Sequence, residues 1–429
     1  MRQSLWLVAA LAAGCAASVR EERLSREVDA PLARGEVTQA IAAYERIGGR
    51  DDRRVRQAAE RLVADALCSR DPAERVRAAR LIADVADPTL DRLLPPLLVD
   101  ADARVRAFAA VALASQADAA REVLVASVNG ADAEARRIAL DGLASLPDPA
   151  AVLRALATDT DIAVRAQVAG TIGGWKPSGA TERAVAEQLL RQLAADVDAG
   201  VRASALRAAG AFGSRALLPD VEGRLEDPAL GVRLAALSSL TRLDRSSPRL
   251  ALLGSAPDRL LALRAAVQLH RLGREALALA AIRDAAGDRR AEVRSAAMNA
   301  AGELGEAGVP LAQPRLRDPD LGVRLDAARA LVHAGHPEIA LATLVSALGT
   351  PLSLDAADEL ARLGDARGRD RLESTALSGD PQARAHALSL LAPLPHSFAT
   401  LTHALTDGDR SVRLTAAEAL LRRAYHKYL

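Results

Sequence analysis

The chain has 429 residues, more than one compact core normally spans, which predicts either several domains or an array of repeats. Half of the residues are apolar but only 2% are aromatic, so few rings are present to stack on bases or flat ligands. The 56 basic and 55 acidic residues leave a formal charge of +1, which argues against nucleic acid or an acidic membrane surface as a partner.

The chain begins with the pattern of an export signal. Arg2 gives a short positive region, residues 5–13 are apolar, and small residues precede Cys15. The stretch is too short to span a bilayer as a mature helix. It resembles a bacterial lipoprotein signal, although Ala12 stands where that family favours Leu.

The resemblance implies that residues 1–14 are a signal peptide and that Cys15 is lipidated. It further implies an outer-membrane lipoprotein that faces the periplasm, so that the chain touches the membrane only through its anchor. A secreted or soluble periplasmic protein is the alternative, as is a cytosolic protein that keeps the apolar segment as a helix.

Residues 15–50 precede the regular part of the chain. Within them, residues 35–49 have the apolar spacing of an amphipathic helix, which we expect to cap the N-terminal end of the fold. The second cysteine, Cys68, stands at the end of an apolar helical run, and we expect it to be buried. With Cys15 acylated, Cys68 has no disulfide partner, so packing must stabilise the fold.

From residue 51 onward the dipeptide Val-Arg, or a degenerate form of it, recurs about every thirty residues. Twelve of the thirteen copies keep the Arg, and most neighbouring copies lie 29 to 31 residues apart. The copies begin at residues 55, 76, 105, 135, 164, 201, 232, 263, 293, 323, 354, 383 and 412. A period of this length indicates a repeat architecture.

The residues around the dipeptide indicate a pair of helices in each repeat. An Asp usually stands five positions before the dipeptide, and Asp71, Asp227 and Asp318 are followed by Pro, as an N-cap is followed by a first helical residue. A small residue four positions later and an apolar one eight positions later complete one helix face. A second apolar run follows a short turn, as in residues 336–348. Neither helix can bury its face alone, so neighbouring pairs must stack.

Residues 227–240 and 318–331 show the fullest form of the motif, DPALGVRLAALSSL and DPDLGVRLDAARAL. This motif resembles the HEAT-repeat family, in particular the short bacterial form that also occurs in phycobilin-lyase-type repeats. The resemblance implies an all-α fold, a right-handed superhelical solenoid of about 12 stacked helix pairs over residues 51–424. Residues 425–429 form a C-terminal tail, and the polar stretch 422–429 is expected to cap that end.

The regular Arg column is interpreted as a structural ladder. In HEAT-like arrays the equivalent Arg pairs with an Asp between repeats, and the near-neutral charge fits internal pairing. The alternative is a stripe of arginines that binds phosphate or carboxylate groups. The expected ladder residues are Arg77, Arg106, Arg165, Arg202, Arg233, Arg294, Arg324 and Arg413, with Asp71, Asp227 and Asp318.

One interval is about seven residues longer than the others, and we assign the excess to residues 173–181. Trp175 lies there beside Lys176, and it is the only Trp left once the signal is removed. A Trp on a protruding loop is a natural hot spot for a protein partner. The alternative is that its ring only fills a widened gap between helices.

Signatures of catalysis and cofactor binding are missing from the sequence. It has no G-x-S-x-G, no phosphate-binding glycine loop and no H-E-x-x-H. His333 and His336 flank a turn without a Cys or Glu cluster at ligand spacing, so we expect no metal there. We therefore expect neither an enzyme nor a cofactor.

The sequence predicts a non-catalytic scaffold or adaptor that binds a protein at the bacterial cell envelope. Its default binding surface is the concave side of the solenoid, which we expect the second helices of the pairs to line. Two other functions stay open, a phycobilin-lyase-like chromophore-handling protein and a cytosolic HEAT array that binds nucleic acid. The identity of the partner and the oligomeric state are not specified by the sequence.

Overall fold

A computed structural model describes residues 20–49, 52–85, 87–146 and 148–425, and every regular element in these ranges is a helix. The predicted signal peptide, Cys15 and residues 426–429 lie outside the described residues. Within the described ranges, no helix combines the length and the apolar character needed to cross a bilayer.

The chain forms two compact units, and one of them combines an early and a late part of the sequence. Unit 1 comprises the described residues up to 94 and from 353 onward, and unit 2 comprises residues 95–352. The helices of unit 1 are η1 (Ser25–Asp29), α2 (Ala30–Ala33), α3 (Val37–Arg46), α4 (Asp52–Leu67), α5 (Pro72–Val85), α6 (Pro88–Asp91), α23 (Ser353–Arg362), α24 (Ala366–Ser378), α25 (Pro381–Leu391), α26 (Phe398–Ala404) and α27 (Arg410–Tyr425).

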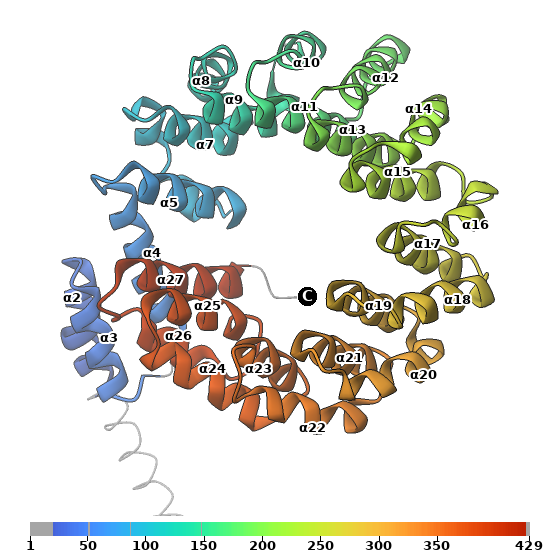
Figure 1. The fold of residues 1–429 in the computed structure, drawn as a ribbon. Helices are drawn as coiled ribbons and strands as arrows, with labels where there is room; N and C mark the ends of the chain where they lie inside the picture. Colours follow the sequence, from blue (N-terminus) through green and yellow to red (C-terminus); the bar gives the residue numbers. More distant parts are fainter. Residues whose placement is uncertain (1–19, 50–51, 86, 147, 426–429) are drawn as a thin grey trace, which may run out of the picture. The chain divides into compact units, whose positions relative to one another are not determined.

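Unit 2 contains eight helix pairs in chain order (Figure 1). Its α-helices are α7 (Ala103–Leu113), α8 (Asp118–Val128), α9 (Ala133–Ala139), α10 (Pro149–Leu156), α11 (Ile162–Gly174), α12 (Ala180–Ala194), α13 (Ala199–Phe212), α14 (Leu218–Gly223), α15 (Leu230–Leu243), α16 (Arg249–Leu253), α17 (Arg259–Arg271), α18 (Glu275–Ala286), α19 (Ala291–Glu303), α20 (Val309–Ala312), α21 (Leu321–His333) and α22 (Pro337–Ala347). Short 3₁₀ segments accompany them: η2 (Pro95–Val99), η3 (Leu140–Ser145), η4 (Arg215–Leu217), η5 (Arg224–Glu226), η6 (Gly305–Gly308) and η7 (Gln313–Arg317).

The first helix of each pair, which carries the recurring dipeptide, packs directly on the first helix of the next pair. Small residues allow this close approach. A Cβ on Gly173 would lie 3.1 Å from Ala208 Cα, and one on Gly302 would lie 3.0 Å from Ala330 Cα. The second helices approach one another less closely. The closely packed row lies on the inner side of unit 2, so the expectation that second helices line the concave side is wrong (Figure 1).

Most first helices begin two residues later than the sequence predicts. The helices after Asp227-Pro228 and Asp318-Pro319 start at Leu230 and Leu321, and the side chain that caps α21 belongs to Asp320. Of the three Asp-Pro pairs that begin five positions before the recurring dipeptide, only Asp71-Pro72 is therefore an N-cap followed by the first helical residue. The physical reason is that the upstream carboxylate is already occupied by an arginine.

That arginine comes from the preceding repeat, and the contact recurs through the array as an Arg–Asp ladder. Asp227 accepts two hydrogen bonds from Arg202, Nε to Oδ2 and Nη2 to Oδ1, both at 2.9 Å. Its Oδ1 also accepts the N–H of Ala229, and its main-chain carbonyl accepts Nη1 of Arg233 at 2.8 Å. One aspartate thus joins two arginines from successive repeats.

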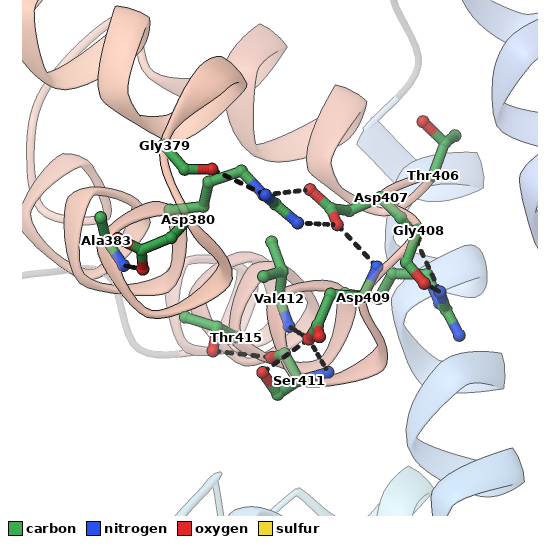
Figure 2. Close-up of polar contacts among 12 residues, drawn as sticks. Gly379, Asp380, Ala383, Thr406, Asp407, Gly408, Asp409, Ser411, Val412 and Thr415 are labelled. Carbon is green, nitrogen blue, oxygen red and sulfur yellow. Dashed lines mark hydrogen bonds and ion pairs between the residues drawn. The ribbon is translucent and has the colours of Figure 1, made fainter.

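The same two-sided arrangement surrounds Asp407, where Arg384 binds the carboxylate and Arg413 binds the carbonyl (Figure 2). The side chains are largely removed from water. Arg202 and Asp227 keep 12% and 1% of their side-chain surface exposed. The other pairs of the ladder are Arg136–Asp159, Arg165–Asp196, Arg233–Asp258 and Arg294–Asp318.

Some expected ladder residues make only part of the ladder contact or lie outside it. Arg106 and Arg324 donate to the main-chain carbonyls of Asp100 and Asp318, as ladder arginines do, but glycine occupies the position of the next aspartate. Arg77 is out of register, because Arg75 makes the ladder-type bond to the Ser69 carbonyl. The sequence signal for this shift is the four-residue spacing from Asp71 to Arg75, which matches that from Asp320 to Arg324.

Two further expectations are wrong. Cys68 is exposed, because α4 ends at Leu67 and the cysteine falls in the turn that follows. The two ends of the fold are not separate capped ends either. Within unit 1, α4 packs against α27 and α3 contacts α26, so helices from the two ends of the array pack on each other.

Replacing Asp227 with Ala should weaken the contact between α13 and α15. The change leaves the nearly buried guanidinium of Arg202 without its counter-charge, at a cost of about 3 kcal/mol. Asp220→Ala is the matched control, because the Arg191–Asp220 pair is exposed and its loss should cost less than ~1 kcal/mol. Native-state hydrogen exchange of the α13 and α15 amides measures both, and equal effects would contradict the buried role of the pair.

Acid should destabilise the array through the same aspartates. The hydrogen bond from Arg202, opposed by burial, lowers the pKa of Asp227, and Arg294 lowers that of Asp318 in the same way. A carboxyl with a lowered folded-state pKa stabilises the fold above its unfolded pKa of about 3.9, and this contribution is lost as pH falls through the folded value. We expect helicity, followed by circular dichroism, to be constant from pH 7 to about pH 4 and to fall below that. A midpoint near neutral pH would contradict this.

Candidate partner-binding groove

The loop that carries Trp175 begins where two glycines end α11. Trp175 is the C-cap, and its N–H donates to the carbonyls of Thr171 and Ile172 at 3.0 and 3.2 Å. Its own backbone is extended, and Pro177 disfavours helical backbone at Lys176. The chain therefore continues from α11 as an extended segment and does not add a further helical turn.

The far end of the loop is fixed by the start of α12. The N–H and the hydroxyl of Ser178 both donate to Oε2 of Glu182, at 2.7 and 2.9 Å. The helix that follows is an unbroken run of 15 residues, whereas the next second helix, α14, has only 6 between two 3₁₀ segments. The extra residues of this repeat are thus shared between the loop and a longer α12, and do not all lie in residues 173–181.

A groove of about 690 Å³ lies between this loop and the preceding repeat. On the opposite wall, the end of the preceding first helix is wound as the 3₁₀ helix η3, which contributes Leu140 and Leu143. The floor is open because Gly170 and Gly174 have no side chains. A Cβ added to either would meet no atom within 4 Å.

A second hollow of about 650 Å³ adjoins the first along the inner face of α11 and α13. The two share Gln167, Gly170 and Gly174, so they form one continuous groove across four repeats, from η3 to Arg242 on α15. Small side chains line most of the second hollow, and Arg207 and Arg242 are the charged residues at its edge.

Charges of opposite sign mark the two ends of the groove. At the first end, Asp141 accepts a 2.8 Å hydrogen bond from Gln167 Nε2, and Glu182 lies nearby. At the second end both arginines are exposed, and Arg207 contacts only the Ser204 hydroxyl among the interactions of the described residues. The groove therefore combines an open floor of glycines with a basic second end and a first end where the two carboxylates lie in the same hollow as the exposed Lys176.

Both residues proposed from the sequence line this groove, Trp175 partly buried and Lys176 exposed. Gln167, Gly170 and the η3 wall could not be identified from the sequence, because only the folded chain brings the four repeats together. The ladder arginines are not among the lining residues, since their guanidinium groups are directed at the loops between repeats.

His333 and His336, where the sequence predicts no metal site, lie in the last helix pair of unit 2. His336 contacts Glu306 at 2.8 Å and Glu338 at 3.2 Å, and these hydrogen bonds raise the pKa of its imidazole. In the ranges that the structure describes, no group of three or more His, Cys, Asp or Glu side chains is placed to hold a metal ion.

No protein-family model matches the chain, and no curated protein matches it. Several solved structures do. An engineered protein matches at 21% identity over 86% of this chain and 98% of its own, with a TM-score of 0.30. The complex of CpcE and CpcF of phycocyanin lyase from Nostoc matches at 22% identity over 63% and 93%, with a TM-score of 0.30. A structure of Kap95p binding RanGDP matches at 15% identity over 93% and 60%, with a TM-score of 0.41.

At these identities and TM-scores, none of the three indicates a function for the chain. The architecture is defined by the chain's own features. A period of about thirty residues, paired helices and a ladder of buried Arg–Asp contacts recur through the described residues. These features describe a HEAT-like helical repeat protein.

Proposed function

We propose that the protein is a scaffold that binds another protein in the groove that extends from η3 to α15. The observation that carries this proposal is the Trp175 loop, which widens one repeat and places the indole beside an open floor of glycines. Large aromatic residues at the edge of a hollow are typical anchors of protein interfaces.

The chemistry of the groove favours an extended polypeptide segment. The floor accepts small apolar side chains, and the groove is continuous over two hollows of about 690 and 650 Å³. Asp141 and Glu182 favour a basic residue at one end of the segment, and Arg207 and Arg242 favour an acidic residue at the other. A partner with this order of charges would bind in one direction only.

A photo-crosslinking amino acid in place of Lys176 should capture the partner in cells, because this side chain is exposed at the edge of the groove. The same amino acid in place of Val197, which is 93% exposed in a loop outside the groove, is the control. Affinity for the purified partner is then measured with Trp175→Ala, which should weaken binding about 30-fold if the indole is a hot spot.

Gly170→Leu tests the groove without relying on loss of a contact. The new side chain enters open space, so the fold is retained while the groove is filled. Gly231→Leu is the matched control, because it also adds a side chain in open space on a first helix, α15, outside the groove. Binding that survives Gly170→Leu as well as Gly231→Leu would refute the groove as the binding site.

The proposed place of action is the cell envelope, with Cys15 lipidated and the repeats facing the periplasm. This part of the proposal rests on the N-terminal sequence alone, with its charged, apolar and small-residue regions before Cys15. A lipid anchor would hold the groove near envelope proteins without a membrane-spanning helix.

Cys15→Ser should release the protein from the membrane fraction into the soluble periplasmic fraction. Membrane and soluble fractions are compared by immunoblot, with the native chain as reference and Cys68→Ser as the control for loss of a thiol. If the Cys15→Ser protein is exported and still sediments with membranes, the lipid anchor is refuted.

A further inference from the structure

The first and last repeats of the chain stack on each other inside unit 1. The first-helix layer runs from α25 to α27 and then to α4, and α26 is followed by α3 in the second-helix layer. Arg410 Nη2 donates to the Asp65 carbonyl at 3.4 Å, and the Tyr425 hydroxyl donates to Glu60 at 2.7 Å. Helix α27 therefore runs antiparallel to α4. We call this contact the terminal seam.

Charged side chains along the terminal seam form a network between α5 and α27. Arg422 lies 2.9 Å from Asp84 and 3.2 Å from Glu418, and Glu418 lies 3.4 Å from Arg77. Arg77 also donates to the Thr415 hydroxyl at 2.8 Å. Arg77, which the register of α5 places outside the Arg–Asp ladder, thus binds α27.

The network is far more accessible to solvent than the ladder. Arg422 and Asp84 expose 37% and 40% of their side chains, and Arg77 and Glu418 expose 38% and 31%. The ladder pair Arg294–Asp318 exposes only 11% and 0%. Salt screens exposed pairs strongly and buried pairs much less, so the terminal seam is the more salt-sensitive contact.

The terminal seam also lacks a ladder contact of its own. The guanidinium of Arg413, the ladder arginine of α27, donates to the carbonyls of Asp407 and Gly408, both in its own loop. Two hollows lie along the seam, one of about 340 Å³ lined by Val55 and Leu420 among others, and one of about 290 Å³ at the charged network. Apolar side chains on both sides of the seam, among them Val55 and Leu420, are buried, so the seam differs from a ladder interface in having its charged pairs exposed.

We propose that the terminal seam is a latch that opens reversibly between α27 and the α4–α5 hairpin while the Arg384–Asp407 ladder pair keeps α25 and α27 together. Opening uncovers the faces of α4 and α27, including buried Val55 and Leu420. The exposed charge network sets the balance between the closed and open forms.

Two spin labels measure the opening directly. One is attached to the native, exposed Cys68 at the end of α4, and the other to Gly408→Cys, where an added Cβ meets no atom within 4 Å, in a full chain with Cys15→Ser. Electron double resonance should give one short distance at low salt. In 1 M NaCl, where the screening length is about 3 Å, a longer distance should appear at the expense of the short one.

Asp84→Arg should increase the open fraction roughly three- to tenfold at low salt, because it replaces an attraction to Arg422 with a repulsion. Reversing all four charges, Asp84→Arg, Arg422→Glu, Glu418→Arg and Arg77→Glu, should restore the short distance. Arg191→Glu, which reverses one charge of an equally exposed pair in unit 2, should change nothing at the seam.

The salt titration uses no charge-reversal variant, so it decides the proposal even if a variant misfolds. A distance distribution that is the same at low and high salt would overturn the latch. So would an open fraction that depends on protein concentration, because the seam would then exchange between copies of the chain.

Discussion

An aspartate that binds one arginine through its carboxylate and the next through its main-chain carbonyl fixes the distance between neighbouring repeats. At Asp227 these arginines are Arg202 and Arg233, and one oxygen of the carboxylate also accepts an N–H of the loop. The loop, the helix before it and the helix after it are therefore held by one residue. The Arg202–Asp227 pair is largely buried, so its geometry is maintained. An exposed pair of the same kind would contribute little to stability.

The sequence predicts the helix pairs and most of the ladder because both depend on local spacing. The prediction fails where the same residues are compatible with two different helix registers. Val76-Arg77 matches the recurring dipeptide, yet Arg75 occupies the ladder position, since the cap at Asp71 starts the helix two residues earlier. Asp-Pro similarly resembles a helix start, but the arginine of the preceding repeat already holds the carboxylate.

The groove and the terminal seam depend on contacts that cannot be predicted from the spacing of residues along the sequence. Trp175 stands out by composition, but the groove beside it also requires the η3 wall from the preceding repeat and the open position at Gly170. The seam requires residues more than three hundred positions apart to meet, as Arg422 and Asp84 do. Both features are departures from the repeat, and a repeat pattern predicts only what its copies share.

The pairing of α4 with α27 has a consequence for how the chain is made. A helical repeat normally gains its neighbour within some thirty residues of further synthesis, which favours folding from the N-terminus onward. Here the face of α4 that meets α27 has to wait until the last helix leaves the ribosome, because the two are separated by nearly the whole sequence. The first repeat to emerge is therefore among the last to be completed, and a truncated product would leave it uncovered.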